Sequence, residues 1–133
     1  NDRILIYGGE QKRPNIHIKD MCRGYLELVN AQHCLIHKNI FNLGSENLAV
    51  RDIANLVSKN TGVNNIETME TDDNRSYHIS SKKFYDTFNF TPNHTVDDAI
   101  SALCASFRDG HLIDPLVNPR YFNIKYLLSN NIS

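Results

Sequence analysis

The feature that most limits the fold of this chain is that its strand-like stretches are short and alternate with helix-like stretches. β-Branched and apolar residues beside turn residues predict strands, here at "RILIY" (residues 3–7), "NIHIK" (15–19), "NIFNLGS" (39–45) and "NIETMET" (65–71). Strands this short rarely form an independent sheet of good size. We therefore expect a mixed α/β fold of three to four short strands and about four helices, in a small lobe that leans on another part of its protein.

The helix-like stretches have apolar residues at three- and four-residue spacing, which is typical of helices with one buried face. The predicted helices cover residues 21–32, 50–62, 80–88 and about 96–110. Asp20, a serine at the start of the third helix and Thr95 are the expected N-caps. Gly62 and Gly110 stand where glycine often ends a helix.

Composition and charge exclude several classes of function. The chain has 133 residues, a size at which a single core is the default, and a net charge of −1. That charge argues against broad electrostatic binding of nucleic acid or anionic lipid. No apolar run approaches the ~20 residues of a membrane span, and no signal-peptide pattern is seen. The three cysteines are odd in number and lie in helix-like stretches, so we expect a reducing, cytoplasmic location.

Several chemical motifs are missing from the sequence. It has no G-x-G-x-x-G, so no dinucleotide fingerprint is present. Tyr121 and Lys125 match the letters Y-x-x-x-K, but they lie in the Pro-broken tail and we interpret the match as coincidence. His33 and His37, with Cys34 beside the first, have the spacing of a zinc-binding pair but no third ligand, so helix-end histidines are the preferred interpretation. We therefore expect no catalytic residue and no metal.

Three separated motifs, taken together, resemble one family. They are "GGEQKRPNIHIKDMCRGYLELV", "IFNLGSENLAVRDIANLVSKNTG" and "DDNRSYHISSKKFYDTFNFTPNHTVDDAI". In this order they are similar to successive blocks of the extended short-chain dehydrogenase/reductase family of NAD-dependent nucleotide-sugar epimerases and dehydratases. The family forms are G-x-x-x-R-x-x-I-H-V-x-D, Y/F-N-x-G before a helix, and R-S-Y leading to LGF-x-P. Here "FNFTP" stands where the family has LGF-x-P.

The resemblance covers only the C-terminal part of such an enzyme. It implies that residues 1–133 are a substrate-binding lobe, normally packed on an N-terminal Rossmann domain that binds NAD(P) and holds the catalytic Tyr-x-x-x-Lys pair. The first residue is Asn and a strand-like run follows at once, so we also expect a piece of a longer polypeptide. The piece itself is then expected to be inactive and to bind no cofactor, and the full enzyme to be a homodimer that oxidises its sugar transiently.

The resemblance also suggests which residues contact the substrate. Arg13 matches the arginine that lies beside the diphosphate of the nucleotide sugar, and Arg75 matches a second arginine on its other side. Guanidinium groups suit phosphate because they offer a rigid fork of donors. Asn47 matches a polar residue that contacts substrate in related enzymes. The alternative for the arginines is an ordinary solvated surface, and His17 and Tyr77 are interpreted as structural.

The main hypothesis is therefore the nucleotide-sugar-binding lobe of an NAD-dependent epimerase or dehydratase. A stand-alone nucleotide- or anion-binding module and a protein-interaction domain are the alternatives. The sequence does not separate epimerase from dehydratase, reductase or dehydrogenase, nor NAD from NADP.

Overall fold

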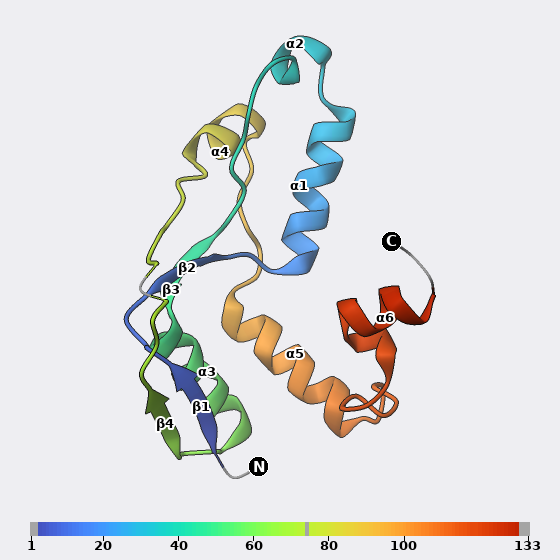
Figure 1. Cartoon of the computed structure of the whole chain (residues 1–133). Coiled ribbons are helices and arrows are strands. Elements are labelled where there is room, and N and C mark those ends of the chain that lie inside the picture. Colours follow the sequence, from blue (N-terminus) through green and yellow to red (C-terminus); the bar gives the residue numbers. More distant parts are fainter. Residues whose placement is uncertain (1–2, 74, 131–133) are drawn as a thin grey trace. The chain divides into compact units, whose positions relative to one another are not determined.

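The computed structural model describes residues 3–73 and 75–130 and divides the chain into two compact units. The first unit extends to Ser101 and the second begins at Ala102. No helix among the described residues is long and apolar enough to cross a membrane. The mixed α/β class predicted from the sequence is confirmed by four short strands and six α-helices in this part of the chain (Figure 1).

The strands of the first unit form two separate two-stranded sheets (Figure 1). Strand β1 (Ile4–Tyr7) pairs in parallel with β4 (Ile66–Met69), so both strands end at the same edge. Strand β2 (Lys12–Asn15) pairs antiparallel with β3 (Glu46–Ala49). The predicted strands at residues 3–7 and 65–71 are thus confirmed, with shorter ends.

Helix α3 (Val50–Thr61) follows β3 directly and packs against both β3 and β1. The Asp52 side chain accepts a hydrogen bond from the Ala49 N–H and so satisfies one free donor at the start of the helix. Gly62 ends the helix with φ +77°, a left-handed conformation that favours glycine. These local signals explain why the sequence predicts this helix correctly.

The first unit also contains helices α1 (Ile18–Asn30), α2 (His33–Ile36) and α4 (Lys82–Phe88), and a buried aromatic cluster centred on α4. Phe84 of α4 is fully buried and contacts the rings of three other phenylalanines, Phe41, Phe88 and Phe90. Gly24 of α1 lies close to this cluster, since a Cβ there would clash with the Leu43 side chain and lie 3.5 Å from Phe84 Cζ.

Helix α5 (Val96–Arg108) begins in the first unit and continues into the second. Its start is capped as predicted, because Thr95 Oγ1 accepts from the Asp98 N–H at 3.1 Å and Asp98 Oδ2 accepts from the Thr95 N–H at 2.8 Å. The second unit then contains a 3₁₀ turn (Pro119–Tyr121) and helix α6 (Asn123–Ser129), which contact each other.

Two predicted strands are wrong. Residues 15–19 do not form a strand, because β2 ends at Asn15 and α1 begins at Ile18. Residues 39–45 form no strand either, since the Gly44 N–H donates to Ser81 Oγ at 2.8 Å and the Gly44 carbonyl accepts from the Tyr85 hydroxyl. Side chains of α4 and its N-cap thus satisfy the backbone groups that a neighbouring strand would otherwise bind.

The predicted N-cap of α1 is also wrong. His17, not Asp20, is the capping residue, and its Nδ1 accepts a hydrogen bond from the Lys19 N–H at 3.1 Å. Asp20 lies in the first turn of the helix and is fully buried. The structural role predicted for His17 is therefore seen directly.

Candidate functional site

A hollow of about 510 Å³ lies where the parallel strands β1 and β4 end. Its lining comes from the turn after β1, including Gly8 and Gln11, from the segment after β4, including Thr71 and Ser76, and from Arg51 of α3. The crevice beyond the carboxyl ends of parallel strands is a common ligand site in α/β proteins. Of the described residues that line this hollow, none is one of the predicted substrate-binding residues Arg13, Asn47 and Arg75, although Ser76 follows Arg75 directly.

The turn after β1 is held by the side chain of Gln11. Gln11 Oε1 accepts from the Gly9 N–H at 2.5 Å, and its Nε2 donates to the Tyr7 carbonyl at 2.6 Å. Arg51 and Glu10, which also line the hollow, form an ion pair at 2.9 Å. The turn that the sequence predicts at Gly8-Gly9 thus has a fixed geometry and leads straight into β2.

The segment that carries Arg75 is fastened to the β2–β3 pair by several hydrogen bonds. The Lys12 N–H donates to Ser76 Oγ at 3.0 Å, and the Tyr77 N–H donates to the Lys12 carbonyl at 3.3 Å. Further along, the Asn47 side chain holds Ile79 through two hydrogen bonds. These contacts bring a segment more than sixty residues away in the sequence beside β2.

Arg13 lies on β2, and its guanidinium group is fixed by several contacts. Nη1 donates to the Arg75 carbonyl and, at 3.0 Å, to the Lys12 carbonyl, while Nη2 lies 3.5 Å from Asp73 Oδ2. The Tyr77 ring centroid is 5.3 Å from the Arg13 Cζ, a distance at which cation–π attraction operates. Tyr77, interpreted from the sequence as a packing aromatic, therefore packs beside a cation.

Arg75 forms a two-pronged ion pair with Asp73. Its Nε and Nη2 donate to the two carboxylate oxygens at 2.7 and 2.9 Å. The hydrogen bonds from Arg75 lower the pKa of Asp73 to about 2, against the smaller effect of burial. Hydrogen bonding to Asp73 likewise raises the pKa of Arg75. Because Asp73 also faces Arg13, one carboxylate joins the two arginines that the sequence singled out.

Asn47, the third predicted contact residue, lies on β3 opposite Pro14 of β2. Its Oδ1 accepts from the Ile79 N–H at 2.9 Å and its Nδ2 donates to the Ile79 carbonyl at 3.1 Å. An amide side chain has two N–H groups and two oxygen lone pairs, so this clamp uses one of each. Asn47 thus holds the segment that follows Arg75 against β3.

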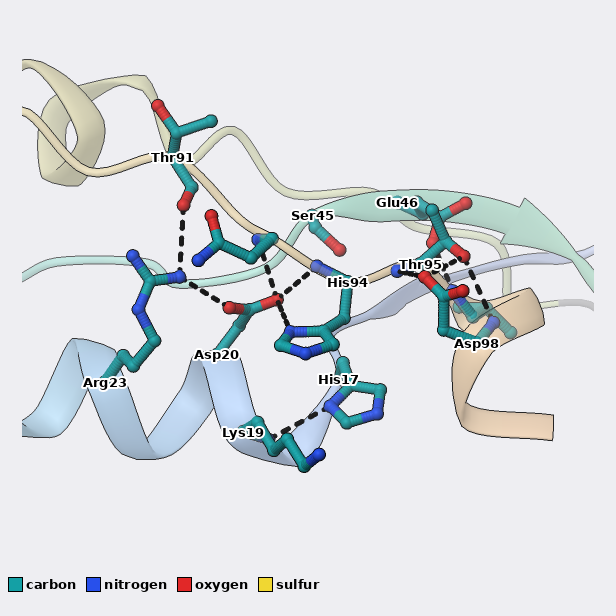
Figure 2. Close-up of polar contacts among 12 residues, drawn as sticks. His17, Lys19, Asp20, Arg23, Ser45, Glu46, Thr91, His94, Thr95 and Asp98 are labelled. Carbon is teal, nitrogen blue, oxygen red and sulfur yellow. Dashed lines mark hydrogen bonds and ion pairs between the residues drawn. The ribbon is translucent and has the colours of Figure 1, made fainter. Parts of the chain in front are cut away.

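The sequence gives little sign of a second polar cluster, at Asp20 (Figure 2). Asp20 Oδ2 accepts from the backbone N–H groups of Asn93 and His94 at 3.0 and 2.8 Å, and Oδ1 accepts from Arg23 at 2.7 Å. The His94 ring lies 3.2 Å from Oδ2 through Nδ1 and stacks on His17 with centroids 4.5 Å apart. The cluster fastens the segment before α5 to the start of α1.

The charge state of Asp20 follows from these contacts. Burial alone would raise its pKa, but the hydrogen bonds from Asn93, Arg23 and His94 outweigh that effect and hold the pKa at about 2. Asp20 is therefore a satisfied, ionised carboxylate within the fold. Its fully buried position and its donors indicate a structural role.

The remaining candidate, the histidine pair near Cys34, lies at α2. The His33 and His37 ring centroids are 4.5 Å apart. Among residues 3–73 and 75–130, no group of three or more potential ligands is placed to hold a metal ion.

No protein-family model matches the sequence, and no curated protein matches it. Solved structures do. The L-threonine dehydrogenase from Clostridium difficile has a TM-score of 0.70 at 18% identity, over 83% of this chain and 37% of that enzyme. UDP-glucose 4-epimerase from Thermotoga maritima, solved with UDP-glucose, has a TM-score of 0.67 at 18% identity, over 82% and 36%. The dTDP-glucose 4,6-dehydratase from Bacillus anthracis, solved with NAD, has a TM-score of 0.64 at 18% identity, over 82% and 35%.

These likenesses show a shared fold. The chain spans little more than a third of the length of each of these enzymes. The chain shares its fold with a part of each of these dehydrogenase, epimerase and dehydratase structures, in keeping with the family that the three sequence motifs resemble.

Proposed function

We propose that residues 1–133 form the C-terminal substrate-binding lobe of an NAD-dependent nucleotide-sugar epimerase or dehydratase, and that Arg13 and Arg75 bind the diphosphate. The observation that carries the proposal is that these arginines, 62 residues apart in sequence, meet around one carboxylate. Ser76, next to Arg75, lines the hollow at the ends of β1 and β4. The similar structures include an epimerase with UDP-glucose and a dehydratase with NAD, which supports the same general kind of enzyme.

The arrangement suits a diphosphate for electrostatic reasons. A guanidinium presents a flat fork of N–H donors that matches two phosphate oxygens at once. Two such forks from neighbouring segments can bind successive phosphates and balance much of their charge. Asn47 lies on β3, the strand that pairs with β2. Its amide has two N–H groups, so one can donate to Ile79 while the other binds a substrate oxygen. In this proposal the lobe orients the nucleotide sugar and the reacting groups come from the other domain.

The described residues do not fit a dinucleotide site. The Gly8-Gly9 turn leads into strand β2, whereas a dinucleotide pyrophosphate rests on the N-terminus of a helix after such a turn. We therefore assign NAD(P) binding, and the catalytic Tyr-x-x-x-Lys pair, to an N-terminal Rossmann domain of the longer enzyme. That domain would be the main partner of this lobe, and the full enzyme a homodimer.

The decisive test is Arg13→Ala in the full enzyme, with affinity for the nucleotide sugar measured by calorimetry. Loss of charge-assisted hydrogen bonds to phosphate should weaken binding by about 10-fold or more. Lys12→Ala is the matched control, because it removes a neighbouring cation from the same strand, and it should change affinity much less. Unchanged affinity in the Arg13 variant would refute the assignment.

The nucleotide can be identified with the chain alone. We expect a heteronuclear NMR titration with UDP, GDP, CDP and dTDP sugars to shift resonances around Arg13 and Arg75 with one nucleotide at the lowest concentration. Binding of comparable strength by free nucleoside diphosphates, without any other domain, would favour the stand-alone anion-binding module. If the spectrum is that of a folded protein and no nucleotide shifts its resonances, the titration would support neither the nucleotide-sugar site nor the stand-alone anion-binding module.

A further inference from the structure

The position of Asp73 between the two arginines suggests a role beyond charge balance. Its carboxylate accepts from Nε and Nη2, which form one edge of the Arg75 guanidinium, at 2.7 and 2.9 Å, and it is the acid that faces Arg13 at 3.5 Å. A carboxylate and a phosphate group offer similar paired oxygens to a guanidinium. Asp73 therefore occupies the edge of the Arg75 guanidinium that would otherwise offer a bound diphosphate two parallel donors.

We propose that Asp73 is an internal competitor for the diphosphate, which the ligand must displace from Arg75 before it binds fully. This inference rests on the proposed function of Arg13 and Arg75. The carboxylate is attached only two residues from Arg75, so its effective concentration at the guanidinium is high and does not depend on ligand. Displacement is feasible because the Arg75 side chain is 82% exposed and Asp73 is 40% exposed.

Two features of a diphosphate allow it to displace Asp73 from Arg75. It has more negative charge than one carboxylate, and it can reach both guanidinium forks at once. The Arg13 fork also has a fixed place without Asp73, because Nη1 remains bonded to the Arg75 and Lys12 carbonyls. Release of Asp73 should then free donors without loosening Arg13.

The opposite role for Asp73 makes a different prediction. If Asp73 held the arginines in their binding positions and stayed in place, its removal would weaken ligand binding. If it acted only through its charge, any nearby acid would have the same effect. Asp72 provides that comparison, since it is an exposed neighbour of the same charge.

The test measures binding of inorganic pyrophosphate to the chain by calorimetry, at fixed pH and ionic strength. We expect Asp73→Asn to bind pyrophosphate about 2- to 5-fold more tightly, a modest gain because exposed ion pairs are weak. The matched control Asp72→Asn should gain about 1.5-fold or less, because a charge outside the ion pair is screened by salt. Weaker binding by Asp73→Asn, or gains of equal size in both variants, would overturn the proposal.

A second measurement distinguishes displacement from persistence. At saturating pyrophosphate, the Arg75 Nε–H resonance should coincide in the wild type and in Asp73→Asn, because in both the fork is bound to phosphate. Resonances that still differ at saturation would mean that Asp73 remains on Arg75, and the competitor role would be wrong.

Failure of the proposed function has its own signature. If Arg13→Ala and Arg75→Ala bind pyrophosphate as well as the wild type, the anion site itself is wrong. If both variants lose affinity but Asp73→Asn shows no gain, the anion site stands and only the competitor role of Asp73 is refuted.

Discussion

Asp20 is held by contacts on both of its carboxylate oxygens. Its side chain is fully buried, and its two oxygens accept from Arg23 and from the Asn93 and His94 backbone. A buried carboxylate is tolerable only when its oxygens are satisfied in this way. One side chain on α1 thus fixes the path of a segment more than seventy residues later.

We expect Asp20→Asn to lower the free energy of unfolding by about 2 kcal/mol, because hydrogen bonds to a charged acceptor are lost and an amide N–H group faces backbone donors. Urea denaturation of the two proteins at pH 7 measures the difference. Asp86→Asn is the control, since Asp86 is an exposed acid paired with Lys82 on one helix face, and it should change stability by less than about 0.5 kcal/mol.

The effect of Asp20 on stability should depend on pH. Its pKa is about 2 in the folded chain and about 3.9 in an unfolded one, so the folded state favours the ionised form. The stabilisation is therefore complete above about pH 4 and is lost as the pH falls from 4 to 2. The stability gap between wild type and Asp20→Asn should shrink over that interval, and a gap that stays constant would contradict this account.

The candidate site illustrates what single residues in a sequence can reveal. The motifs predicted Arg13 and Arg75 as a pair, and the structure brings them together, although their substrate role stays a prediction. The part of Asp73 was missed, even though an acid two residues before Arg75 is a visible local signal. Its contact with Arg13 depends on how the chain folds back on β2, which residue spacing does not encode.

At the level of secondary structure, the helices with local signals were predicted best. Gly62 caps the end of α3, and the Thr95–Asp98 capping box begins α5. A few neighbouring residues therefore determine each of these two boundaries. The β2–β3 pair was missed because neither strand has a strong local preference. β2 contains Pro14 and β3 contains Glu46, and only their mutual pairing makes them strands.

The aromatic cluster around α4 should carry much of the stability of the first unit. We expect Phe84→Ala to lower the free energy of unfolding by about 4 kcal/mol, because a fully buried ring leaves a cavity among neighbours that cannot collapse completely. Phe107→Ala on α5 removes a ring that is 50% exposed and should cost much less. Urea denaturation compares the two variants, and equal losses would show that the cluster is not the centre of the fold.

On the scale of the whole molecule, few large apolar side chains are buried. Among the described residues the buried apolar set consists of Ile6, Ala49, Ala54, Phe84 and Phe90. Helix α1 meanwhile exposes Ile18, Tyr25 and Val29 at 69%, 62% and 78%. A chain of this size with so small a core has little hydrophobic stabilisation to set against its conformational entropy.

The chain alone should therefore be marginally stable. We expect an unfolding free energy below about 5 kcal/mol, at the lower limit for natural domains, and clear binding of the dye ANS to the native protein. Urea denaturation and dye fluorescence provide the two measurements. A free energy of unfolding above about 8 kcal/mol with no dye binding would show that the exposed apolar side chains do not limit the stability of the chain.

The clamp between Asn47 and Ile79 limits how such a lobe can change during evolution. One side chain must donate to and accept from the same backbone residue, and among side chains only Asn and Gln carry an N–H donor beside a carbonyl oxygen, with Asn the shorter. A mutation at this position would disturb the segment that carries Arg75, whatever the ligand. New ligand preferences should therefore be acquired at freer positions, and the exposed Arg75 side chain can vary at far lower cost to the fold than the asparagine that holds its segment in place.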